Sequence, residues 1–152
     1  MPALAWTDDL LLAQPEMDRT HEEFVEILAT TRAALLAGDR TEGLASFERL
    51  TAHTVEHFGQ EDRWMASIGF PMPNCHSQPH DTVLQLMREV LRLAREQDHR
   101  GAIEVLADEL GAWFPQHART LDAGLASAMK ESGFDPLAAP ISPVMPAEAT
   151  TA

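Results

Sequence analysis

Residues that alternate between spacings of three and four form four separate stripes along this chain. The first stripe is Met17, His21, Phe24, Leu28, Thr31 and Leu35, and the second is Phe47, Leu50, Thr54, His57, Glu61, Trp64 and Ile68. The third is His76, His80, Val83, Met87, Val90 and Ala94, and the fourth is Ile103, Leu106, Leu110, Trp113, His117, Leu121 and Leu125. Such spacing puts each stripe on one face of a helix. The pattern therefore predicts four amphipathic helices.

Breaks between the stripes are short. Gly38-Asp39 ends the first predicted helix, Gly69-Phe70-Pro71 ends the second, and the segment 98–101 ends the third, while the fourth runs toward Gly133. No stretch alternates with the period of two that a half-buried strand requires. Because short connections make successive helices antiparallel neighbours, we predict an all-α, up-down-up-down four-helix bundle.

The two ends of the chain lack this periodicity. Residues 1–16 carry Trp6 and an apolar run before Gln14-Pro15, which predicts an arm laid over the core. Residues 136–152 contain four prolines and many alanines without apolar spacing, which is typical of a disordered tail. We therefore predict one domain over residues 1–135 and a Pro/Ala-rich tail over 136–152.

Composition excludes several classes of partner. The formal net charge of −13 repels phosphate backbones and anionic headgroups, so neither nucleic acid nor a membrane surface is expected to bind. No apolar stretch is long enough to cross a bilayer, and no basic residue precedes an apolar run at the N-terminus. The single cysteine, Cys75, excludes an internal disulfide. We expect a soluble cytoplasmic protein, and the sequence names no protein partner.

Several residues on the inward stripes are polar. They are His21, His57, Glu61, His76, His80 and His117. One buried histidine is usually a satisfied structural imidazole, but so many groups from four helices need a common partner, because an unpaired buried carboxylate costs several kcal/mol or takes up a proton. A metal on the bundle axis would supply that partner.

The local spacings agree with such a site, with one exception. His57 with Glu61, and His76 with His80, are four residues apart and share a helix face. Asp122 follows His117 by five residues, which on a regular helix separates them by about 140°. That pair requires a bridging role or a local distortion, and Pro115 offers one source by loosening the turn just before His117.

The donor set indicates the metal. Five imidazoles and two carboxylates without a thiolate exceed the needs of one tetrahedral zinc and disfavour calcium or magnesium, so two borderline metals fit better. A ferritin-like bundle requires two Glu-x-x-His motifs, and this chain has only Glu96 with His99, which we interpret as a solvated helix end. His53 forms a rival pair with His57, but it lies off the stripe and is expected to flank the site or lie on the surface.

The candidate ligands belong to longer motifs: Ala5-Trp6-Thr7-Asp8, Met17-Asp18-x-x-His21, His57-Phe58-x-x-Glu61-Asp62, His76-x-x-x-His80 and Trp113-x-x-x-His117-x-x-x-x-Asp122. In these motifs the chain resembles the bacterial hemerythrins over about residues 3–135. This resemblance implies that His76, His80 and His117 bind one iron ion, that His21 and His57 bind the other, and that Glu61, Asp122 and an oxo or hydroxo group bridge the two. The predicted up-down-up-down topology is also that of myohemerythrin, a known example of such a bundle.

The same resemblance implies a function. The second iron has one open position, where dioxygen would bind reversibly for storage, delivery or sensing. Trp113 and Phe114 would contribute to the cofactor site, with Phe114 in the place where hemerythrins commonly have a leucine. The alternatives are a di-iron enzyme acting on peroxide, nitric oxide or ferrous iron, and a helical protein that binds zinc or no metal.

Three residues depart from the family pattern or adjoin a ligand. Pro79 lies between His76 and His80, and it fits only if the third helix starts close to His76, so that proline occupies the first turn. Ala13 stands where many hemerythrins have glycine. Cys75 adjoins His76, and we expect it to be buried in packing rather than to act as a ligand or a redox switch.

Overall fold

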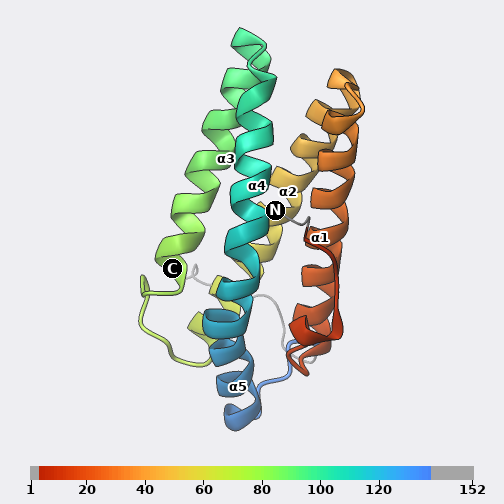
Figure 1. Cartoon of the computed structure of the whole chain (residues 1–152). Coiled ribbons are helices and arrows are strands. Elements are labelled where there is room, and N and C mark those ends of the chain that lie inside the picture. Colours follow the sequence, from red (N-terminus) through yellow and green to blue (C-terminus); the bar gives the residue numbers. More distant parts are fainter. Residues whose placement is uncertain (1–3, 138–152) are drawn as a thin grey trace.

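Four long helices pack side by side in the computed structural model, which describes residues 4–137 (Figure 1). They are α1 (Pro15–Leu36), α2 (Arg40–Ser67), α3 (Ser77–Gln97) and α4 (Arg100–His117). A π-helical segment, Ala118–Asp122, and α5 (Ala123–Ser132) continue α4, so these three form the fourth helix of the bundle. Residues 4–137 contain no strand, and none of their helices is long and apolar enough to cross a membrane.

Each helix contacts the next one along the chain, and α4 also contacts α1, which closes the bundle. The predicted all-α, up-down-up-down topology is confirmed. Short connections make successive helices antiparallel. Gly38 follows the end of α1 and Gly69 the end of α2, and both adopt positive φ angles, 78° and 89°, which glycine tolerates best. The second helix is longer than predicted, because Asp39 caps it by accepting a hydrogen bond from Glu42 N–H, well before the first stripe residue, Phe47.

The fourth helix departs from the predicted stripe near Asp122. Simple spacing placed Leu121 inward, yet Leu121 is only partly buried while Asp122 is fully buried. The π-helical segment accounts for this difference, because its wider turn accommodates one more residue than an α-helical turn. The stripe resumes at Leu125, which is buried.

The N-terminal arm runs down the outside of the bundle to the start of α1 (Figure 1). It contains a short 3-10 helix, Asp8–Leu10, whose Leu10 is buried in the core. The arm joins α1 through a hydrogen bond of 2.8 Å from Leu12 N–H to Asp18 Oδ1. The predicted arm is thus confirmed for residues 4–14. Residues 138–152 lie outside the described residues, so the disordered tail and the domain limit at residue 135 stay predictions.

The apolar core is divided into two clusters. The larger fills most of the bundle and includes Phe24, Leu28, Phe47, Leu50, Phe58, Met87, Leu110 and Phe114. The smaller lies toward the other end and consists of Met17, Trp64, Met65, Leu125, Ala126 and Met129. Along each of α1, α2 and the fourth helix, buried polar residues stand between members of the two clusters. A polar layer therefore interrupts the core.

Candidate metal centre

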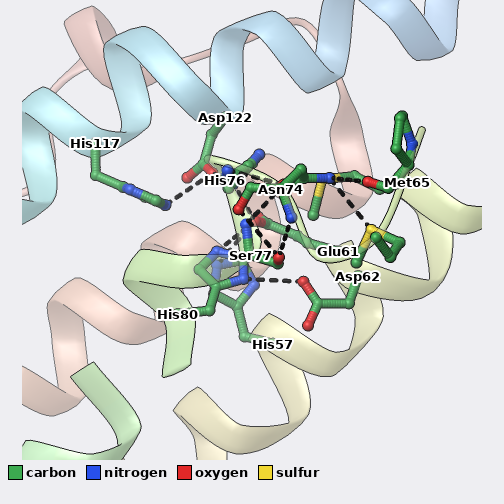
Figure 2. A network of polar contacts seen from close by, with 12 residues as sticks. His57, Glu61, Asp62, Met65, Asn74, His76, Ser77, His80, His117 and Asp122 are labelled. Atoms are coloured by element: carbon green, nitrogen blue, oxygen red, sulfur yellow. Dashed lines mark hydrogen bonds and ion pairs between the residues drawn. The ribbon is translucent and has the colours of Figure 1, made fainter. Parts of the chain in front are cut away.

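Seven buried side chains meet in this polar layer, and all seven were candidates from the sequence. Figure 2 labels all of them except His21. They are His21, His57, Glu61, His76, His80, His117 and Asp122, and none is more than 5% exposed. Their nitrogen and oxygen atoms form two groups, within each of which all atoms lie within 4.8 Å of one another. One group contains His76, His80 and His117, the other contains His21 and His57, and both contain Glu61 and Asp122.

The two oxygens of Glu61 face different histidines. Oε1 lies 3.3 Å from His76 Nε2 and 3.4 Å from His80 Nε2. Oε2 lies 3.2 Å from His57 Nε2 and 3.5 Å from His21 Nε2. The carboxylate therefore stands between the two groups with one oxygen toward each.

Asp122 divides its oxygens in the same way. Oδ1 lies 2.8 Å from His76 Nε2 and 3.2 Å from His117 Nε2. Oδ2 lies 3.0 Å from His21 Nε2. The pattern of the two carboxylates thus separates the five imidazoles into a set of three and a set of two.

The start of α3 brings His76 into the site. Asn74 Oδ1 accepts hydrogen bonds of 2.8 Å from the N–H groups of His76 and Ser77, and Ser77 Oγ accepts one of 2.8 Å from Asn74 N–H. These bonds satisfy the first free N–H groups of the helix. Pro79 falls in the first turn, as predicted, where a missing N–H costs least.

The segment after His117 brings Asp122 into the site. Ala123 N–H bonds to Ala118 O, five residues back, which is the π-helical pattern. Because a π-helical turn is wider than an α-helical turn, residues that are five positions apart come closer to the same face than they do on a regular α-helix. The predicted distortion is therefore present, but it follows His117, whereas we expected it just before that residue, at Pro115. Pro115 itself lies inside α4.

Burial and the two carboxylates shift the pKa values of the imidazoles in opposite directions. Burial lowers the pKa of His21 and His76, but contacts with Asp122 and Glu61 outweigh burial and raise both pKa values to about 9. Burial dominates at His57, whose pKa falls to about 4. Although burial raises the pKa of each carboxyl group, neighbouring imidazoles hold the pKa of Glu61 and Asp122 below the usual range. Bound metal cations would take over the role of the protons on His21 and His76.

The nitrogen and oxygen atoms of the layer are placed as ligands of a common cation would be. Several buried atoms have no hydrogen-bond partner in residues 4–137: Nε2 of His21, His80 and His117, both oxygens of Glu61, and Oδ2 of Asp122. Each of these atoms nevertheless lies 3.0–3.5 Å from another possible ligand atom of the cluster, a nitrogen facing an oxygen. Two ligands that each bind a metal at about 2.1 Å and at right angles lie about 3 Å apart. The spacing of these nitrogen and oxygen atoms therefore fits metal ions bound at about 2.1 Å.

Aromatic rings surround the imidazoles. Phe58 stacks on His80 with ring centroids 3.9 Å apart, and Trp113 stacks on His117 at 4.3 Å. Phe114 packs edge-on against His21 at 5.1 Å. Phe24 in turn stacks on Phe114 at 4.9 Å. Trp113 thus adjoins the set of three histidines and Phe114 the set of two, so both predicted cofactor-site residues border the centre.

The remaining candidates lie outside the cluster. His53 is partly buried, stacks on His57 and contacts Glu23 at 3.0 Å, so its predicted flanking position is confirmed. Glu96 and His99 are exposed, as expected for a solvated helix end. The predicted burial of Cys75 is wrong: its side chain is exposed, because the residue lies in the connection between α2 and α3 and not on an inward helix face.

Sequence reasoning missed two neighbours of the centre. Asp62 Oδ1 lies 3.1 Å from His80 Nδ1, and the ring of Phe58 lies flat against that of His80. Both residues stand in the His57-Phe58-x-x-Glu61-Asp62 motif, but spacing on one helix does not reveal which residue of another helix they touch. Only the packing of α2 against α3 brings them to His80.

A four-helix bundle whose core is interrupted by imidazoles and carboxylates defines a helical metalloprotein. Residues 13–128 match the family model described as the hemerythrin HHE cation binding domain. The chain is 32% identical over 135 residues to a bacteriohemerythrin of Ralstonia nicotianae, covering 89% of this chain and 95% of that protein. It is 24% identical over 131 residues to a bacteriohemerythrin of Stenotrophomonas maltophilia, covering 86% and 84%.

The chain belongs to the bacterial hemerythrin family. Family membership and the buried cluster of histidine, glutamate and aspartate together indicate a non-haem iron protein.

Proposed function

We propose that this chain holds two non-haem iron ions and uses them to bind dioxygen reversibly, for storage, delivery or sensing. His76, His80 and His117 would hold one iron, and His21 and His57 the other. Glu61 and Asp122 would bridge the two, together with an oxo or hydroxo group. Iron in this setting supplies the electrons that bind dioxygen and recovers them on release.

The division of the carboxylate oxygens carries this proposal. A carboxylate that bridges two metals presents one oxygen to each, and both Glu61 and Asp122 direct their two oxygens at different histidine sets. In a site for a single ion, there would be no reason for either carboxylate to direct its two oxygens at different histidine sets. The donors also favour two borderline metals over calcium or magnesium, which prefer oxygen ligands.

The two histidine sets differ in the number of imidazoles, which supports binding of an external ligand at the set with fewer. The set of two offers one imidazole fewer than the set of three, which leaves room for an external ligand beside His21 and His57. Phe114 packs against His21 there and is 2% exposed. The aromatic ring carries no acidic or basic group, and it excludes water. The absence of a proton source and the absence of water both favour the release of dioxygen unchanged. This feature favours a carrier over the di-iron enzyme.

Iron content and the response to dioxygen test the proposal. The full chain is reduced without oxygen, loaded with ferrous iron and desalted, and its iron per chain is measured before its visible spectrum is followed during repeated exposure to dioxygen and its removal. We expect two irons per chain and an absorption band that appears and disappears over several cycles. Rapid bleaching with turnover of peroxide or nitric oxide would support the enzyme instead, and absence of iron would refute both.

A further inference from the structure

One of the five imidazoles has a carboxylate behind it. His80 Nδ1, the ring nitrogen that faces away from Glu61, lies 3.1 Å from Asp62 Oδ1 (Figure 2). The His80 side chain is 1% exposed and that of Asp62 is 33% exposed. Because an ionised carboxylate can only accept hydrogen bonds, this contact places the proton of a neutral His80 on Nδ1. Nε2, which lies 3.4 Å from Glu61 Oε1, is then free to bind a cation.

The ring of His80 is fixed in a second direction as well. Phe58 stacks on it with an interplanar angle of 9° and a centroid distance of 3.9 Å. Stacking restrains the plane of the ring, and the hydrogen bond to Asp62 restrains rotation within that plane. Since Phe58 and Asp62 both belong to α2, a single helix determines where Nε2 of His80 points.

The other set of histidines lacks this support. Nδ1 of His21 and Nδ1 of His57 are both buried and have no hydrogen-bond partner within the part of the chain that the structure describes. A carboxylate that accepts the distal N–H of a metal-bound imidazole makes that imidazole a stronger electron donor. The two sides of the centre therefore differ in donor strength as well as in the number of histidines.

We propose that Asp62 is a positioning residue of the centre: it holds His80 with Nε2 toward the metal and strengthens its donation to the iron bound by His76, His80 and His117. This role rests on the proposed di-iron site. Stronger donation stabilises the ferric state more than the ferrous state, so Asp62 lowers the reduction potential of that iron. It also makes the set of three histidines the tighter of the two sites.

Two substitutions separate the roles of Asp62. Asp62→Asn keeps an oxygen that can accept the His80 N–H but removes the negative charge, whereas Asp62→Ala removes both. Asp81→Asn is the matched control, because Asp81 adjoins His80 in sequence, is exposed on α3 and changes the net charge equally. The full chain and the three variants are titrated with ferrous iron without oxygen, and the midpoint potentials of the loaded proteins are measured. Imidazole ¹⁵N spectra of the metal-free proteins, recorded at an alkaline pH at which His80 is neutral, report which of its ring nitrogens carries the proton.

Asp62→Ala is expected to weaken binding of one of the two irons by about 10- to 100-fold and to lose the preference for a proton on Nδ1. Asp62→Asn should keep that preference and most of the affinity while its midpoint potential rises. Asp81→Asn should match the wild type. If the wild-type chain binds two irons and both Asp62 variants equal Asp81→Asn in affinity, potential and tautomer, the role of Asp62 is refuted alone. A folded wild-type chain that binds fewer than two irons refutes the di-iron site and this role with it.

Discussion

His117 Nε2 lies 3.2 Å from Asp122 Oδ1, although a regular α-helix would turn the two side chains well apart. The π-helical segment between them removes the difference, because its wider turn realigns residues that are five positions apart. Segments of this kind are uncommon and often occur at functional sites. Here the irregularity provides the second of the two carboxylates that link the histidine sets.

This relationship predicts the outcome of changing the length of the segment. Deleting Arg119, an exposed residue, leaves His117 and Asp122 four positions apart, the spacing that shares a face on a regular helix. We expect the deletion variant to keep both irons. Inserting one alanine after Arg119 turns Asp122 away by about 100° and should lose iron. Iron per chain, compared at equal helix content by circular dichroism, checks both variants, and a deletion variant that binds less iron than the insertion variant would contradict the explanation.

Removing a carboxylate that contacts both histidine sets should lower the iron content more than removing an imidazole that belongs to one set. Glu61 contacts both histidine sets, whereas His57 belongs to one, so Glu61→Ala should lose both irons and His57→Ala about one. Glu56→Ala removes an exposed acid from the same helix and should leave the iron content unchanged. Iron per chain after anaerobic loading and desalting measures this. Retention of two irons by Glu61→Ala would show that Glu61 is not a bridge.

The pKa values of the histidines predict an unusual pH dependence for the protein stripped of metal by a chelator. Because the pKa values of His21 and His76 rise from 6.5 to about 9 on folding, their contribution to stability is complete below pH 6.5 and is lost as the pH rises toward 9. The pKa of His57 falls to about 4, so its contribution is present above pH 6.5 and is lost below it.

The stripped protein should therefore be most stable near pH 6.5, and its unfolding temperature should fall between pH 6.5 and 9. Iron holds the imidazoles neutral, so the loaded protein should show no such decrease on the alkaline side. Thermal unfolding followed by circular dichroism across this range provides the measurement. Parallel curves for the stripped and loaded proteins would contradict the proposed exchange of protons for metal.

The arm contains a strained residue that glycine should relieve. Ala13 has a φ angle of 59°, a left-handed conformation that costs an L-residue about 1–2 kcal/mol, which exceeds the entropic cost of about 0.5–1 kcal/mol that glycine adds. Ala13→Gly should therefore stabilise the fold by about 0.5–1 kcal/mol. Ala52→Gly, at an exposed position inside α2, should destabilise it by about 1 kcal/mol. Urea unfolding compares the two, and equal losses would show that the angle of Ala13 carries no strain.

The sequence by itself determined the number of helices, their inward faces and six of the seven polar side chains in the centre. It could do so because helical periodicity is a local property: His57 and Glu61 share a face wherever α2 packs. Pro79 could also be assigned to a first turn, because the missing N–H of proline is tolerated there and not in the interior of a helix.

Only the tertiary structure decided which atoms of different helices meet. It buried Asp122 in place of Leu121, directed one oxygen of Glu61 at each histidine set, brought Asp62 to His80 and left Cys75 exposed. These outcomes depend on how the helices are rotated and offset against one another, and on where one helix departs from regular geometry. Packing between distant parts of the chain determines these rotations, offsets and irregularities, and the spacing of residues within one helix does not predict them.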